Sequence, residues 1–238
     1  MIKVVGIMEM ATSFEGFEGF EGSVMALAIF LLINSITPGP NNLMLLHGSI
    51  ARGFWACRWH MLGITTGVTI MLWLSYWGMA ALVISFPAMM LAIKVLGTLY
   101  LLWLTYQMAK TDFMAIVHKA LKYEQERILT NENAVKVKKH FGELPLNFGQ
   151  ALLFQWLNPK AWTMTVVAPS LAMFHAGKPW LDNYALLAMC ALINILSISC
   201  WALGGHWLRK LVHLPRVMKI VHALIVLMTL YCALTLWL

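Results

Sequence analysis

Long apolar runs bounded by charged residues dominate this sequence and limit what it can fold into. Of the 238 residues, 61% are hydrophobic and 11% are charged, and the mean hydropathy is +0.74. A bilayer core is crossed by roughly 20 mostly apolar helical residues, and several runs reach that length. We therefore predict an all-α polytopic membrane protein. Six transmembrane helices are expected, near residues 24 to 46, 61 to 84, 90 to 109, 148 to 174, 184 to 205 and 220 to 238.

The basic residues behind the net charge of +7 lie in short loops between the apolar runs, where they act as topology signals. We therefore expect no nucleic-acid partner. Alternating loops place most basic residues on one side: Arg52, Arg58, Lys110, Lys119, Lys122, Arg127, Lys136, Lys138, Lys139, Arg209, Lys210, Arg216 and Lys219. The opposite side holds Lys3, Lys94 and Lys178, and Lys160 falls inside the fourth span. Cytoplasmic loops carry the excess of Lys and Arg. Both termini are therefore predicted to lie outside the cytoplasm.

The order of the apolar and polar segments divides the chain into four parts. Residues 1–22 form an extramembrane N-terminal arm, and residues 23–109 form a first three-helix repeat. Residues 110–147 form a polar cytoplasmic connector, and residues 148–238 form a second three-helix repeat. Because three spans precede the connector, the second group runs in the opposite orientation. This is the arrangement of a 3+3 inverted repeat.

The first and fourth spans, which open the two groups, are interrupted by proline. The first break runs from Asn34 to Asn42, and the fourth span breaks between Gln155 and Lys160. Proline has no N–H, and its ring displaces the carbonyl four residues earlier. Pro38, Pro40 and Pro159 therefore free the backbone oxygens of Asn34, Ile36 and Gln155. In lipid these oxygens must face protein, water or a ligand.

Each break also offers a helix start that suits a zwitterion. Asn158 is a good N-cap, and Pro159 suits the first helical position. A half-helix N-terminus attracts a carboxylate, and the freed carbonyls upstream attract an ammonium group. The alternative is a simple proline kink. We take the substrate-binding candidates to be Asn34, Thr37, Pro38, Gly39, Pro40, Asn41, Asn42, Gln155, Asn158, Pro159 and Lys160.

Lys160 is the one cation deep in a predicted span, and no Asp or Glu falls within any of the six. A charge at the bilayer centre costs at least about 2.5 kcal/mol. We expect its partner to be a freed carbonyl, water or a substrate carboxylate. The alternative is that the span is shorter and that Lys160 snorkels to the cytoplasmic surface.

Other polar residues are interpreted more simply. Asn194, Ser197, Trp201 and Gly204 of the fifth span, and Thr65 and Thr69 of the second, lie on interior faces at helical spacing. Gly63 and Gly67 have the spacing of close helix packing. His47 and His222 are the candidates for proton coupling, against an interfacial role, because the spans contain no carboxylate. The cysteines have no paired spacing, so we expect no disulfide, metal site or cofactor, and without an acid pair or activated nucleophile we expect no enzyme.

Several motifs together resemble the lysine exporter superfamily. They are Thr37-Pro38-Gly39-Pro40-Asn41-Asn42, the Gly63 to Gly67 turn, Lys94-x-x-Gly97-x-x-Tyr100-Leu101-x-Trp103, and Phe154-x-x-x-Asn158-Pro159-Lys160-Ala161-Trp162. The likeness covers residues 24 to 238. Within the branch of the superfamily called RhtB, Cys200-Trp201-Ala202-Leu203-x-Gly205-His206 and Tyr231-Cys232-Ala233 are most similar to the cysteine/O-acetylserine exporter group.

The resemblance implies a six-span bacterial inner-membrane secondary transporter that exports a small neutral amino acid, driven by the proton gradient. Cysteine, O-acetylserine, homoserine and threonine are the kinds of substrate implied. Many relatives carry an Asp after the second glycine of the second span, where this chain has Val68. A proton route through that carboxylate is therefore absent. The competing interpretations are a passive channel or facilitator and a membrane scaffold without a substrate. The expected partners are a small amino-acid substrate and membrane lipid, and the chain can form a homo-oligomer.

The distribution of basic residues predicts that both termini lie on the periplasmic face. Alkaline phosphatase fused after Leu238 should be active, and a fluorescent protein that matures only in the cytoplasm should stay dark at the same position. Fluorescence from that fusion, with inactive phosphatase, would overturn the topology and the inverted repeat with it.

Overall fold

The computed structural model describes residues 20–110, 112–115, 118, 122, 146–172 and 179–237, and the elements assigned there are helices. The all-α class is therefore confirmed for this part of the chain. The elements are α2 (Phe20–Ile36), α3 (Pro40–Arg52), η1 (Phe54–Cys57), α4 (Arg58–Leu74), η2 (Ser75–Met79), α5 (Ala80–Ser85), α6 (Pro87–Lys110), α8 (Phe148–Leu157), α9 (Pro159–Ala172), α10 (Pro179–Leu208), η3 (Arg209–Leu211) and α11 (Pro215–Leu234). Most of the predicted N-terminal arm and of the polar connector lies outside the described residues.

Three segments within the described residues are long and apolar enough to cross a membrane: Pro87–Lys110, Tyr184–Leu211 and Pro215–Leu234. Val24–Ile36 and Pro40–Arg52 pass the same test together, although they meet at an angle of 50°. Helices also occupy the predicted second and fourth spans, where α4 is followed by η2 and α8 by α9. The count of six spans remains a prediction.

The second predicted span is not one uninterrupted α-helix. After α4 the chain widens into the π-helical segment η2, in which Gly78 has φ 98° and ψ 1°. Side chains disfavour this left-handed backbone, whereas glycine adopts it readily because it has no Cβ. The predicted span over residues 61 to 84 therefore contains a kink that the sequence did not indicate, since an isolated glycine is also common in membrane helices.

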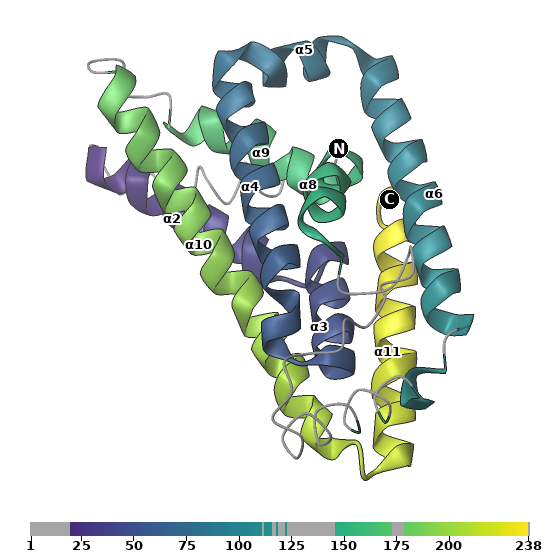
Figure 1. Ribbon diagram of the computed structural model, residues 1–238. Coiled ribbons are helices and arrows are strands. Elements are labelled where there is room, and N and C mark those ends of the chain that lie inside the picture. The colour runs from purple at the N-terminus through teal and green to yellow at the C-terminus, as the bar shows by residue number, and fades with distance from the viewer. Residues whose placement is uncertain are drawn as a thin grey trace.

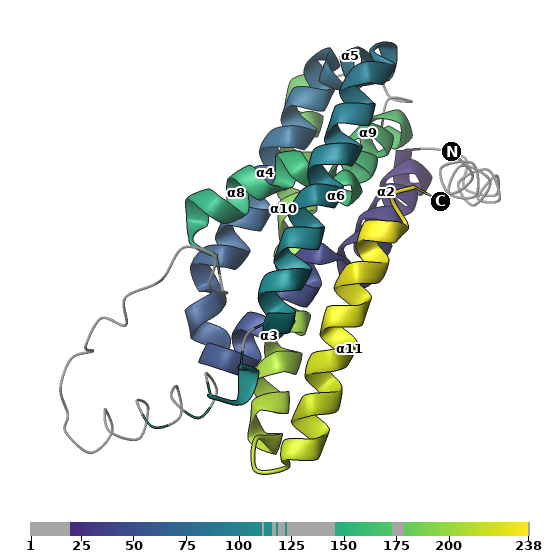
Figure 2. The same ribbon diagram turned by 90° about the vertical axis from the view of Figure 1, so that its right-hand side faces the viewer.

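The helices of the two halves pack against each other reciprocally. In the first half, α4 packs on α8 and α9, while in the second half α10 packs on α2 and α3. The third helices, α6 and α11, lie side by side in both views (Figures 1 and 2). In each half, the broken first helix therefore packs against the second helix of the other half.

Basic residues gather at one end of the bundle. The C-terminal ends of α3, α6 and α10 and the start of α11 lie toward the lower end of the molecule in Figure 1. The basic side chains of these helix ends and their short connections are Arg52, Arg58, Lys110, Arg209, Lys210, Arg216 and Lys219. The neighbouring side chains at Trp55, Trp59 and Trp207 are exposed, as is typical of residues at a membrane interface.

Glycines allow the closest helix contacts. A Cβ on Gly63 would collide with the backbone oxygen of Phe148 in α8, and one on Gly67 would lie 2.7 Å from Cγ of Gln155. These glycines therefore serve the packing of α4 on α8, as their spacing predicted. Gly97 of α6 similarly faces the backbone at the α8–α9 break.

Neighbouring glycines in α10 provide a matched test of this packing. A Cβ on Gly205 would collide with Oγ of Ser49 and the backbone oxygen of Leu46, both in α3, whereas one on Gly204 would meet only Cδ1 of Leu46 at 3.9 Å. Gly205→Ala should lower the free energy of unfolding by about 1–3 kcal/mol, and Gly204→Ala should change it by less than about 0.5 kcal/mol. Thermal unfolding of the purified variants in one detergent measures the difference. Equal midpoints would show that α10 and α3 do not pack this closely.

Candidate functional site

The first break is set by proline and threonine. The residue before a proline disfavours helical geometry, and α2 accordingly ends at Ile36, one residue before Thr37. The Thr37 hydroxyl donates to the backbone oxygens of Ile33 at 2.7 Å and Asn34 at 3.4 Å. The chain passes through extended Gly39, and α3 restarts with Pro40 in its first turn. This local chemistry ends α2 at Ile36 and begins α3 at Pro40.

The second break follows the same pattern in α8 and α9. The helix α8 begins with a capping box between Asn147 and Gln150 and ends at Leu157. Asn158 is buried, and its Oδ1 accepts the backbone N–H of Lys160 at 3.1 Å. Pro159 is the first residue of α9. The N-cap role expected of Asn158 is therefore present.

Protein groups satisfy the freed carbonyls. The indole N–H of Trp201 in α10 donates to the backbone oxygen of Ile36 at 2.8 Å. The Asn42 side chain donates to the oxygens of Ser35 and Thr37, both at 2.8 Å. At the second break, the backbone N–H of Asn158 donates to the oxygen of Gln155 at 3.1 Å. The expectation that these oxygens face protein, water or a ligand is met by protein.

Lys160 connects the two breaks. Its ammonium group donates to the backbone oxygen of Thr37 at 2.7 Å, to the Thr37 hydroxyl at 2.9 Å and to the oxygen of Pro38 at 3.4 Å. A Cβ on Gly39 would lie 2.9 Å from Cδ of Lys160. Glycine at this position therefore leaves the room that the lysine stem uses. The negative end of the α2 dipole also favours a cation here.

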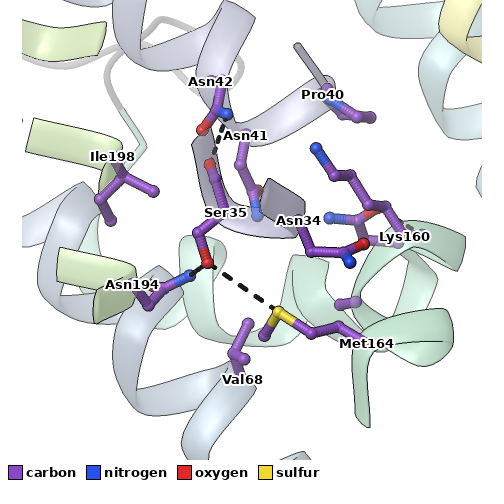
Figure 3. A pocket seen from close by; sticks show the side chains of 13 residues that line it. Asn34, Ser35, Pro40, Asn41, Asn42, Val68, Lys160, Met164, Asn194 and Ile198 are labelled. Atoms are coloured by element: carbon purple, nitrogen blue, oxygen red, sulfur yellow. Dashed lines mark hydrogen bonds between the residues drawn. The ribbon is translucent and has the colours of Figure 1, made fainter. Parts of the chain in front are cut away.

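A small cleft opens between the broken helices (Figure 3). It is lined by predicted residues of the two breaks, namely Asn34, Gly39, Pro40, Asn41, Asn42, Asn158 and Lys160. It is also lined by residues that were not among the predicted site residues, namely Ser35, Val68, Ala161, Met164, Asn194 and Ile198. Of these, Asn194 had the clearest signal, a polar residue on an interior face of the fifth span.

The remaining predicted residues support the lining rather than form it. Thr37 and Pro38 hold the Lys160 ammonium group, and Pro159 begins α9. The Gln155 amide exchanges hydrogen bonds with Asn41, at 2.8 Å in one direction and 3.2 Å in the other. This amide pair ties α8 to the first turn of α3. The cleft thus offers amide groups and one cation.

The two proton-coupling candidates lie together, outside this cleft lining. The ring centroids of His47 in α3 and His222 in α11 are 5.6 Å apart. Phe113 contacts both, stacked on His222 at 4.8 Å and tilted against His47 at 4.7 Å. His47 is 5% exposed, and neither of its ring nitrogens has a hydrogen-bond partner within the described residues. The sequence named both residues, but it gave no sign that they are neighbours or that Phe113 joins them.

Comparison with known proteins assigns the chain to a family. The model of the LysE type translocator family matches residues 32–238. The chain is 26% identical over 207 residues to the cysteine/O-acetylserine efflux protein of Escherichia coli O157:H7, covering 86% of this chain and 92% of the relative. It is 25% identical over 205 residues to the protein of the same name from Escherichia coli K12, with the same coverage. No solved structure matches the chain.

The family match and the named relatives indicate a transmembrane efflux transporter rather than an enzyme. The match begins within α2 and includes both breaks, the cleft lining and the His47–His222 pair. The resemblance inferred from the motifs is therefore confirmed at the level of the family. This chain belongs to the LysE type translocator family.

Proposed function

We propose that the protein is a secondary active exporter of a small neutral amino acid across the bacterial inner membrane. The observation that carries this proposal is the Lys160 ammonium group, which lies on the carbonyl end of α2 beside a cleft lined by amides. Cysteine and O-acetylserine, which the relatives' names give as their cargo, are small zwitterions of this kind. Homoserine and threonine belong to the same chemical class.

The binding mode follows from an exchange of partners. A substrate carboxylate is a better partner for Lys160 than a neutral carbonyl, because charge-assisted hydrogen bonds are stronger. The substrate ammonium group then takes the oxygens of Thr37 and Pro38 that Lys160 gives up. Each charge keeps a partner throughout, which matters because an unpaired charge in the membrane is costly. The starts of α3 and α9 add positive potential for the carboxylate.

The architecture proposed for transport is a six-span 3+3 inverted repeat with periplasmic termini. The reciprocal packing of α4 on α8 and α9, and of α10 on α2 and α3, supports this repeat. In such repeats the binding site lies where the broken helices meet, and rocking of one half against the other alternates access. The 50° bend between α2 and α3 is a suitable hinge.

We also propose that protons drive the export and that the His47–His222 pair carries them. The position that is an Asp in many relatives is Val68 in this chain, and Val68 lines the cleft. Histidine is the side chain whose unperturbed pKa lies nearest physiological pH. His47 lies in α3, whose first turn lines the cleft, so a change in its charge acts on a helix of the proposed substrate site.

The proposed binding mode predicts that Lys160→Met weakens transport without harming insertion. Losing a charge-assisted hydrogen bond of about 1.5 to 3 kcal/mol should raise the half-saturation concentration roughly tenfold to a hundredfold. Lys160→Arg should retain part of the binding, because the charge survives while the geometry changes. Counterflow of labelled cysteine and homoserine in proteoliposomes measures this, with Lys94→Met in α6 as the matched control.

The same vesicles separate the competing functions. A scaffold gives no counterflow, whereas a passive facilitator gives counterflow that an imposed pH gradient does not stimulate. A proton-coupled exporter responds to the gradient, and His47→Phe should remove that response while counterflow persists. Normal transport by Lys160→Met at equal expression would show that the carboxylate is held elsewhere.

A further inference from the structure

A polar network beside the cleft joins both halves of the protein, and Figure 3 shows its members Ser35, Asn194 and Met164. The hydroxyl of Thr65 in α4 donates to Oδ1 of Asn194 in α10 at 3.0 Å. The amide nitrogen of Asn194 donates to Oγ of Ser35 in α2 at 3.3 Å. The Ser35 hydroxyl in turn lies 3.9 Å from the sulfur of Met164 in α9. Four helices thus meet in one chain of hydrogen bonds.

This network has more hydrogen-bond donors than strong hydrogen-bond acceptors. A thioether sulfur is a weak acceptor, so the Ser35 hydroxyl proton has a poor partner in Met164. The Asn194 amide nitrogen carries two protons, and Ser35 is the acceptor found for it among the described residues. Asn194 is 5% exposed and Ser35 is 6% exposed, yet both line the cleft. Buried donors without a strong acceptor favour a ligand that supplies one.

The surroundings of these donors are apolar and narrow. Val68, Ile198 and Met164 also line the cleft and are at most 5% exposed. A charged ligand group would lose its hydration here without a counter-ion, which is unfavourable. A neutral group with a lone pair keeps a hydrogen bond and buries its carbon atoms against these walls. The chemistry therefore fits a short neutral side chain with an oxygen or sulfur near its tip.

We infer that Ser35 and Asn194 form a side-chain subsite that selects amino acids with an oxygen or sulfur acceptor over apolar isosteres. This inference rests on the proposed function, because it assumes that the amino-acid backbone binds at Lys160. Figure 3 shows Lys160 and Pro40 on one side of Ser35, and Asn194 and Ile198 on the other. Thr65 fixes the Asn194 amide from behind and is not part of the cleft lining. It therefore positions the subsite and does not touch the ligand.

A site built to hydrogen-bond a polar side chain rejects the analogue that lacks it, because its donors are then left unpaired. The test is counterflow in proteoliposomes with matched pairs: serine and cysteine against 2-aminobutyrate, and homoserine against norvaline. Each pair exchanges a hydroxyl or thiol for a methyl group. The ratio of half-saturation concentrations within a pair reports the subsite, while the backbone interactions cancel.

Ser35→Ala and Asn194→Leu should each reduce the preference for the polar member by about three- to tenfold. Thr105→Val in α6 is the matched control: it removes a buried hydrogen bond, from the Thr105 hydroxyl to the backbone oxygen of Leu101, at nearly constant volume and outside the cleft lining, and it should keep the ratio near that of the unmodified protein. Ser35→Ala changes so little volume that it remains a valid test if Asn194→Leu folds poorly. Size-exclusion profiles in detergent confirm the folding of each variant.

The outcomes separate this inference from the proposed function. If the unmodified protein moves no member of the panel, the proposed function fails. If it moves the panel without preference, or if Ser35→Ala keeps the original ratio, export stands and the subsite is overturned. A loss in Thr105→Val as large as that in Ser35→Ala would also overturn it, because the ratio would then respond to any lost buried hydrogen bond.

Discussion

Backbone groups inside a membrane must be hydrogen-bonded by the protein, and this constraint shapes the whole molecule. Pro38, Pro40 and Pro159 break two helices and leave carbonyl oxygens that water cannot reach in lipid. The structure resolves this with side chains from other helices, including the Trp201 indole on the oxygen of Ile36. The broken helices must therefore lie inside the bundle, where these donors are. The position of the cleft follows from this requirement.

Lys160 meets two such hydrogen-bonding requirements at once. The half-buried Lys160 ammonium group needs acceptors, and the end of α2 offers oxygens that need donors. Their pairing holds the second half of the protein to the first across the cleft. Because neutral carbonyls are weaker partners than a carboxylate, this contact can be exchanged for a substrate without leaving a charge alone. The contact between Lys160 and the end of α2 therefore stabilises the protein without substrate and is also the contact that a substrate replaces.

The sequence predicted the local features of the site because proline, asparagine and glycine act on their own neighbours. The ends of α2 and α8, the Asn158 cap and the packing of Gly63 on α8 all follow from such short-range rules. Periodicity likewise predicted helices over the apolar runs. These rules need no knowledge of which helices are neighbours.

Features that depend on which helices are neighbours could not be predicted from the sequence. Ser35 and Met164 line the cleft through contacts between α2 and α9, and no pattern in either helix indicates the other. The pairing of His47 with His222 depends in the same way on how α3 meets α11. The π-helical segment at Ser75–Met79 depends on a balance between packing and backbone strain that one glycine does not reveal.

The most direct measurement of the central claim is an experimental structure determined with an exported amino acid bound at saturation. The account predicts a carboxylate oxygen within hydrogen-bond distance of the Lys160 ammonium group, and a substrate ammonium group on the oxygens of Thr37 and Pro38. Lys160 should have moved from its 2.7 Å contact with Thr37. An amino acid bound outside the cleft, with that contact intact, would contradict the account.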